Sequence, residues 1–526
     1  MRAITAFVTV LVLVSIGPVW VSAQAVDGEV FRAIREEGFE RSQAMETVSW
    51  LSDVFGPRVT GTPSIEAAKD WAADRMRRWG LRVYEERFPY GRGWSLERFH
   101  AHLVAPQIMP IIGYPRAWTT STDGVVTADV VRVVISSRDD LDQYRGTLSG
   151  KIVLTHPARR VEMLEGDLVL RLDDELLTDV SQLPRGTSQQ KGSGGTGTKL
   201  DDYVNQFFLE EGVVAVLDRG SDVSLVGGAP LGSDLVWPTQ RTDGGTIFVG
   251  TGGSRAVEAV DVVPSATIAV EHYNRLVRLL NHNVPVSVEI NIQTRFHEET
   301  QPNGFNLIAE FPGTDLADEV VILGAHFDST HAATGATDNA VGVAAMMEAV
   351  RILQTLDVRP RRTIRVALWG GEEEGLLGSR AYVTRHFGDA KSQLLKSGHE
   401  TVSAYYNIDN GTGRIRGVWL QGNDAVEPIF RRWMGELSDL GVTTIGRRST
   451  RGTDHVPFDE VGLPGFQFIQ DRLEYNSRTH HSNMDVFDRV QSEDLRQMAV
   501  VTAIFAYRTA MRDESLPRKD RDRLEP

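Results

Sequence analysis

Five side chains of the types that bind divalent metals occur in one region, at the ends of expected strands: His326, Asp338, Glu373, Asp409 and His481. Two further acids, Asp328 and Glu372, stand beside members of this set. Histidines and carboxylates, with one carboxylate shared, can hold two divalent cations close together. Such a pair of ions activates water and polarises a carbonyl group. The set therefore favours a hydrolase.

Each of these residues also has a structural explanation when it is taken alone. Asp338 directly precedes a helical pattern and could be an N-cap, and Asp409 could be a turn former. Three adjacent acids, 372–374, are typical of a solvated surface, but these follow an apolar strand. Like charges at such a position are unfavourable unless cations offset their repulsion. One Glu as ligand and its neighbour as general base would divide the chemistry well.

Strand and helix patterns alternate from about residue 300 to the end of the chain. A buried strand is expected at 320–325, and a helix with apolar spacing at 339–356. The further expected strands are 363–369, 404–408 and 465–469, and the further expected helices are 376–387, 425–440 and 492–511. This alternation predicts an α/β fold with a mixed, mostly parallel sheet between helices, whose ligands bind at the carboxyl ends of the strands.

The N-terminal half has a different pattern of expected helices, strands and turns. Helical periodicity covers 28–55, Ser64 is the expected N-cap of a helix that ends near Trp79, and 81–88 alternates like a strand. Short Val-rich strands, frequent turns and Gly/Ser/Thr clusters such as 192–198 then predict a β-rich insertion. The expected organisation is a signal peptide at 1–23, an α/β domain in two parts at 24–117 and 291–515, an insertion at 118–290, and a charged tail at 516–526.

The bulk composition narrows the class of protein. The chain has 526 residues, which suits two or three domains. Its net charge of −15, with 56 basic and 71 acidic residues, argues against a nucleic-acid-binding protein, which needs a basic surface. There is no cysteine, so any zinc ion must be held by histidines and carboxylates.

The first 23 residues have the features of a secretory signal peptide. Arg2 supplies the positive charge, 6–19 is almost entirely apolar, and 21–23 is a small-residue cleavage pattern. The protein is therefore expected to be secreted or periplasmic. An uncleaved N-terminal anchor is the open alternative, although the apolar run is short for a span. No stable membrane span is expected after cleavage.

The residues of the candidate centre lie in five blocks that resemble those of one known family: 326–329, 335–339, 372–379, 407–409 and 481–482. The family is that of the co-catalytic zinc exopeptidases, which includes bacterial leucyl aminopeptidases and glutamate carboxypeptidases. The short gap from His326 to Asp338 and the ending His480-His481-Ser482 are most similar to the plasma glutamate carboxypeptidase branch. Residues 58–63 resemble the N-terminal block of the family, and 148–154 and 211–216 resemble a protease-associated domain.

The resemblance implies the zinc exopeptidase fold, two Zn²⁺ ions and a role for each residue. His326 and Asp409 would bind one ion, Glu373 and His481 the other, and Asp338 both. Glu372 would be the general base, and Asp328 would orient His326. The Gly-Leu-x-Gly-Ser pattern after the acids fixes this register and leaves Glu374 as the spare acid. The resemblance also implies a cis peptide bond between Asp338 and Asn339.

The expected function is that of a metallo-exopeptidase acting on a peptide substrate, as an aminopeptidase or dipeptidase. A carboxypeptidase would need a basic side chain for the terminal carboxylate, for which Arg451, Arg472 and Arg478 are candidates. A non-catalytic receptor-like module and a single-zinc acyl-cyclising enzyme are weaker alternatives, because the full two-metal set is retained. Side-chain preference and oligomeric state stay open, with a homodimer as one option.

Overall fold

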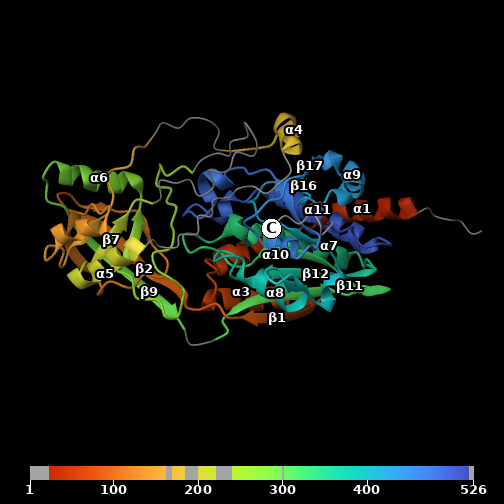
Figure 1. The fold of residues 1–526 in the computed structure, drawn as a ribbon. Helices are drawn as coiled ribbons and strands as arrows, with labels where there is room; N and C mark the ends of the chain where they lie inside the picture. The colour runs from red at the N-terminus through yellow and green to blue at the C-terminus, as the bar shows by residue number, and fades with distance from the viewer. Residues whose placement is uncertain (1–22, 162–168, 184–198, 221–239, 299–300, 520–526) are drawn as a thin grey trace, which may run out of the picture.

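The chain forms two lobes, each built around an eight-stranded sheet (Figure 1). The structure is a computed structural model, and it describes residues 23–161, 169–183, 199–220, 240–298 and 301–519. The expected signal peptide, apart from Ala23, lies outside the described residues, as do the 192–198 cluster and all of the charged tail beyond residue 519. We call the lobe with the candidate centre the main lobe, and the other the inserted lobe.

The sheet of the main lobe is mixed, with a parallel centre. Its strands, in spatial order, are β1 (Arg82–Phe88), β10 (Gly304–Phe311), β12 (Arg362–Trp369), β11 (Leu316–His326), β15 (Val402–Asn407), β18 (Gly465–Gln470), β16 (Ile415–Trp419) and β17 (Thr444–Gly446). The four strands from β12 to β18 run parallel to one another. The pairs β1–β10, β10–β12 and β16–β18 are antiparallel. The mixed α/β architecture expected from the sequence is confirmed.

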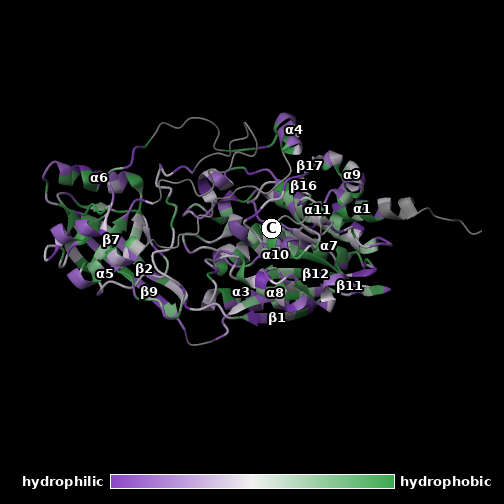
Figure 2. Ribbon diagram, in the orientation of Figure 1, coloured by the Kyte–Doolittle hydropathy of each residue, from purple (hydrophilic) through white to green (hydrophobic). Residues whose placement is uncertain are grey.

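Helices cover both faces of this sheet because its strands are apolar on both sides. Along β11, Val321 and Leu323 pack into one hydrophobic cluster, and Val320 and Ile322 into another. The first cluster is completed by α1 (Ala23–Glu40), α2 (Ala44–Ser49), α3 (Pro63–Arg78), α7 (Val341–Thr355), α9 (Glu427–Gly435) and α11 (Ser492–Met511). The second is completed by α8 (Leu377–His386) and α10 (His455–Glu460). Figure 2 shows this distribution of hydropathy on the ribbon.

The inserted lobe has its own sheet and core. The strands, in spatial order, are β3 (Met109–Pro110), β2 (Gly93–Ala105), β9 (Ser287–His297), β5 (Val126–Arg132), β6 (Ile152–Leu154), β7 (Ala215–Asp218), β8 (Ser265–Ile268) and β4 (Gly113–Pro115). Helices α5 (Lys199–Glu211) and α6 (Val270–Asn281) cover opposite faces, since Val153 packs with Phe207, whereas Ile152 packs with Leu276.

The chain leaves the main lobe after β1 and returns to it at β10, and these two strands pair with each other. The sheet of the inserted lobe begins at Gly93 and ends at His297, so it extends beyond both expected boundaries, 118 and 290. Strand β2 was not predicted because the apolar alternation along its 13 residues is interrupted at a register shift between Leu96 and Arg98. It is nevertheless paired along its length with β9.

One helix between β6 and β7 in sequence lies with the main lobe in space. Helix α4 (Asp174–Gln182) stands next to β17 in Figure 1. Its Leu177 and Val180 pack with Trp419 and Ile469 of the main sheet. The two lobes are therefore joined by packing as well as by the two chain crossings.

Several expected elements differ in detail. The helical pattern of 28–55 is divided, because α1 ends at Glu40, α2 begins at Ala44, and a π-helical turn follows at Trp50–Val54. The N-cap of α3 is Thr62 and not Ser64, with Pro63 at the first helical position, where its missing N–H costs nothing. The expected 425–440 helix ends at Gly435 and is followed by a short 3₁₀ turn.

The close packing around β11 gives a first prediction. A Cβ atom added to Gly324 would lie 2.2 Å from the hydroxyl of Tyr405. That hydroxyl is held by hydrogen bonds with Trp369 at 2.9 Å and Asn407 at 2.6 Å, so it cannot move away freely. We expect Gly324→Ala to lower the free energy of unfolding in urea by about 1–3 kcal/mol.

The matched control is Gly435→Ala, at the end of α9. No atom lies within 4 Å of the Cβ added there. Alanine is also the better helix former, by up to about 1 kcal/mol. The control should be neutral or slightly stabilising, and an equal loss in both variants would contradict the packing argument.

Candidate metal centre

Three parallel strands bring the candidate residues to one edge of the main sheet. His326 is the last residue of β11, and it stands in register with Trp369, the last residue of β12. Glu372 and Glu373 follow Trp369 after two glycines. Asp409 follows β15 by two residues. Parallel strands end at the same edge, so these side chains meet although they are distant in sequence.

The side chains of this edge form two groups that share one carboxylate. His326 Nε2 lies 3.1 Å from Asp338 Oδ1 and 3.3 Å from Asp409 Oδ1. His481 Nε2 lies 3.0 Å from Glu373 Oε2 and 3.4 Å from Asp338 Oδ2. Each oxygen of Asp338 therefore faces a different histidine. The five residues singled out in the sequence thus lie together in one cluster.

Asp338 does not act as a helix cap. It lies in a π-helical turn, Ala336–Ala340, before α7, and Asn339 accepts the hydrogen bond from the amide of Gly342. The Asp338-Asn339 peptide bond is cis, as the resemblance implied. The amide of Asp338 donates to Asp485 at 3.1 Å. The Oδ2 atom of Asp338 is buried and has no hydrogen-bond partner among the described residues, which suits an atom that binds a cation.

Asp328 holds the surrounding backbone more directly than it holds the imidazole. Its carboxylate accepts hydrogen bonds from the amides of Glu372 at 3.3 Å and Glu373 at 3.4 Å. It is the main-chain oxygen of Asp328 that lies 3.1 Å from His326 Nδ1, while the carboxylate is 3.6 Å away. A hydrogen bond from Nδ1 leaves Nε2 as the free acceptor, which is the arrangement of a metal-binding histidine.

His480 lies beside the cluster but is placed differently from His481. Its ring stacks on that of His481 with 3.8 Å between centroids, and it also contacts Tyr475. Its Nε2 atom is 3.8 Å from Asp338 Oδ2, farther than that of His481. Burial, together with the neighbouring His481, lowers the pKa of His480 to about 3. His480 is therefore neutral at ordinary pH, and it lies close enough to Asp338 and His481 to form a possible ligand group with them.

The electrostatics of the cluster favour added positive charge. Burial raises the pKa of Glu372 well above its usual value, and the carboxylates of Asp409 and Asp454 raise it further against the effect of His326. Burial alone would lower the pKa of His326, but Asp409 and Glu372 raise it well above its usual value. Several buried acids thus repel one another at one place, and a divalent cation would relieve that repulsion.

Two further acids belong to the surroundings of the cluster and were not assigned a role from the sequence. Asp485 accepts hydrogen bonds from the amides of Thr337 and Asp338, and burial raises its pKa to about 7. Asp454 accepts a hydrogen bond from Ser379 at 2.5 Å, and burial also raises its pKa to about 7. Their positions depend on loops, so no strand or helix pattern could have indicated them.

The loops that carry His326 and Asp338 are joined by a single buried guanidinium. Arg58 is fully buried, and it donates to four main-chain oxygens at 2.9–3.0 Å: those of Leu51, Phe327, Thr334 and Gly335. The main-chain amide of Arg58 donates a further hydrogen bond to the hydroxyl of Ser329 at 3.0 Å. A segment far away in sequence thus fixes the backbone on both sides of the candidate centre.

Comparison with known proteins relates this chain to peptidases. Residues 306–506 match the model of peptidase family M28. Carboxypeptidase Q of Homo sapiens is 24% identical over 93% of this chain and 91% of its own length. A crystal structure of a peptidase M28 precursor from Shewanella amazonensis SB2B has a TM-score of 0.63 and 24% identity, covering 95% of this chain and 100% of that one. A zinc aminopeptidase from Bacillus subtilis has a TM-score of 0.52 and 20% identity, covering 88% and 93%.

The contacts of Arg58 predict a large effect of its removal. Arg58→Met nearly keeps the volume of the side chain but removes the donor from four carbonyl groups, three of them buried, and an unsatisfied buried group costs about 1–3 kcal/mol. We expect the free energy of unfolding in urea to fall by about 3 kcal/mol or more. Arg77→Met on the exposed face of α3, where Arg77 pairs with the exposed Asp74, should change the free energy of unfolding by less than about 0.5 kcal/mol. Similar values for both variants would show that the guanidinium does not join the loops.

Proposed function

Since this chain belongs to peptidase family M28, whose members are co-catalytic zinc exopeptidases, we propose that it removes residues from the ends of peptides, as an aminopeptidase or dipeptidase. The observation that carries the proposal is the position of Asp338, whose two oxygens face two histidines. One carboxylate shared between two sites is the arrangement that a two-metal hydrolase needs.

We assign the ligands of the two Zn²⁺ ions from these contacts. His326 and Asp409 would hold one ion, Glu373 and His481 would hold the other, and Asp338 would contribute one oxygen to each. Imidazole nitrogens and carboxylate oxygens are the ligands that zinc takes in a chain without cysteine. When bound, the pair of ions lowers the pKa of water and polarises the scissile carbonyl group.

Glu372 is the residue proposed to move the proton. It is buried beside the cluster, and its backbone is held by the carboxylate of Asp328. We propose that it takes a proton from the attacking water and delivers it to the leaving amine. A carboxylate with a raised pKa is suited to both steps, because it can hold the proton between them.

A carboxypeptidase of the same fold is the second candidate, and one observation favours it. Arg472 is a half-buried cation near the cluster, where it interacts electrostatically with Tyr475 and Asp409. A guanidinium in this position could bind the terminal carboxylate of a substrate. The name of the human relative, carboxypeptidase Q, agrees with this second candidate.

The remaining features of the sequence complete the proposal. We propose that residues 1–23 are a signal peptide and that the protein is secreted or periplasmic. Among the described residues, no helix is both long and apolar enough to cross a membrane. The inserted lobe is proposed to be a protease-associated domain, with Gly93–His297 in place of 118–290 as its extent.

Replacement of the proposed base tests the mechanism. We expect Glu372→Gln to retain two Zn²⁺ ions per chain, measured by elemental analysis, and to lose at least about 10²–10⁴-fold in kcat. The matched control is Glu374→Gln, which changes the neighbouring acid in the same way and should retain most of its turnover. A fully active Glu372→Gln enzyme, or a larger loss in the control, would refute the assignment of the base.

Blocked dipeptides test the direction of cleavage. An aminopeptidase or dipeptidase needs the free amino terminus, so N-acetylation of a dipeptide should abolish hydrolysis. A carboxypeptidase needs the free carboxylate, so amidation of the C-terminus should abolish hydrolysis instead, while N-acetylation is tolerated. Initial rates on the free, N-acetylated, C-amidated and doubly blocked forms of one dipeptide separate the two candidates. Loss of hydrolysis with either single block would indicate a strict dipeptidase.

A further inference from the structure

His481 differs from the other members of the cluster in how it is positioned. His326 is the last residue of a strand of the main sheet, and Glu373 and Asp409 come shortly after two others. His481 instead lies in a loop beyond a π-helical turn, Tyr475–Thr479. Its φ of 61° places it in the left-handed region, which a residue other than glycine seldom adopts. Contacts outside the main sheet must therefore hold this loop.

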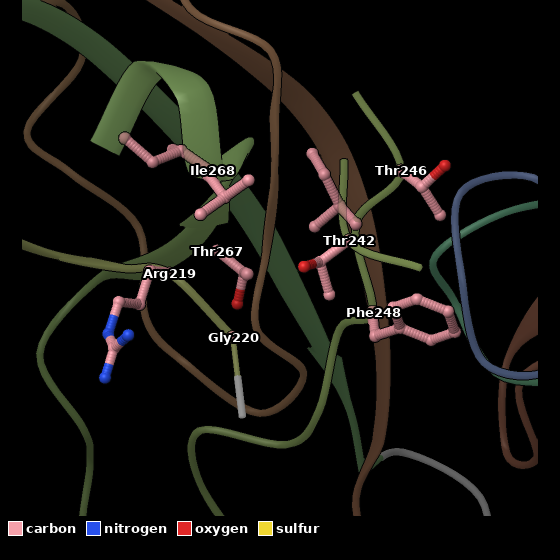
Figure 3. A pocket seen from close by; sticks show the side chains of 9 residues that line it. Arg219, Gly220, Thr242, Thr246, Phe248, Thr267 and Ile268 are labelled. Carbon is pink, nitrogen blue, oxygen red and sulfur yellow. The ribbon is translucent and has the colours of Figure 1, made fainter. Parts of the chain in front are cut away.

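Those contacts come from the inserted lobe. Residues 240–251, which we call the strap, run alongside the loop of residues 477–483. Phe248 forms an antiparallel bridge with Ser482. The amide of Val249 donates to the carbonyl oxygen of His481 at 3.2 Å, and the amide of Arg241 donates to that of Ser477 at 2.7 Å. Figure 3 shows Thr242, Thr246 and Phe248 of the strap, where they line a pocket of the inserted lobe.

The side chain of Asn483 forms hydrogen bonds between the loop and the strap. Its Oδ1 accepts from the amide of Ile247 at 2.8 Å, and its Nδ2 donates to the carbonyl of Gly245 at 3.0 Å. Its own amide donates to the carbonyl of Ile247 at 3.1 Å. Three hydrogen bonds thus join this one residue to the strap, two positions after His481.

The strap also contacts the loop that follows His326. Ile247 and Val249 are buried with Ala332 of the main lobe in one small hydrophobic cluster. Close by, the ring of His331 lies 2.8 Å from the carbonyl oxygen of Pro115 in the inserted lobe. Both loops are therefore buried against the inserted lobe, and the strap lies between them.

We propose that Asn483 and the strap position His481 for metal binding, so that the inserted lobe sets the Zn²⁺ affinity of one of the two sites. This inference rests on the proposed role of His481 as a ligand. Asn483 is a positioning residue, because it acts on the metal only through the backbone of His481. The site formed by His326 and Asp409 depends on strands β11 and β15 and should not be affected.

The test is the Zn²⁺ affinity of the metal-depleted full-length protein, titrated in competition with a chromophoric chelator. Groups that orient a ligand typically change metal affinity by about 10–100-fold. We expect Asn483→Ala to weaken one of the two sites by about tenfold or more and to leave the other unchanged. Asn483→Asp keeps the acceptor for Ile247 but loses the donor for Gly245, so it should weaken the same site.

The matched control is Asn274→Ala in α6 of the inserted lobe. Asn274 accepts from the amide and donates to the carbonyl of Arg159, both at 2.7 Å, so it makes the same kind of double contact away from the centre. Its replacement should lower the thermal stability of the metal-free protein and leave both Zn²⁺ affinities unchanged. If this control weakens Zn²⁺ binding as much as Asn483→Ala does, the positioning role is refuted.

The outcomes separate this inference from the proposed function. If the unaltered protein binds two Zn²⁺ ions and both Asn483 variants bind them equally well, the strap does not position His481 and the inference is wrong. If the unaltered protein binds fewer than two, the proposed function fails and the inference fails with it. Selective weakening of one Zn²⁺ site in either folded variant supports both the proposed function and the inference about the strap.

Discussion

The repulsion among buried carboxylates at one edge of the main sheet is the constraint on which the rest of the structure depends. Asp338, Glu372, Glu373 and Asp409 lie together there, and burial with neighbouring negative charge raises the pKa of both Glu372 and Glu373. Two histidines contact these carboxylates directly, and the donor atoms lie close enough together to hold cations. A cluster of this kind is costly for stability alone, so its presence is explained by chemistry that needs it.

The backbone around the cluster is held by groups that do not touch a substrate. Arg58 joins the loops on both sides of the centre through main-chain oxygens. The carboxylates of Asp328 and Asp485 accept hydrogen bonds from the main-chain amides of Glu372 and Asp338, respectively. Ligand side chains can then keep their positions, because the peptide groups that carry them already have hydrogen-bond partners.

The inserted lobe takes part in the same arrangement. It enters between two paired strands, yet its strap and α4 return to the main lobe at two separate places. At the first, the strap binds the loop of His481, and at the second, Arg171 pairs with the buried Asp471 and Asp494. The loop that carries His481 is therefore held from the inserted lobe as well as from the main lobe.

The sequence by itself determined the mixed α/β fold, because apolar runs and helical patterns alternate along the chain. It also indicated that His326, Glu373 and Asp409 would meet, because parallel strands end at one edge. Asp338 and His481 lie in irregular segments, and only the tertiary structure brings them to that edge. The sequence did not determine the extent of the inserted lobe, since a register shift between Leu96 and Arg98 interrupts the apolar alternation of β2, and its pairing with β9 appears only in the structure. It could not identify Arg58, Asn483 or Asp485 as supports of the centre. Their contacts are with main-chain atoms hundreds of residues away or in irregular loops, and such contacts exist only when the tertiary structure brings the segments together.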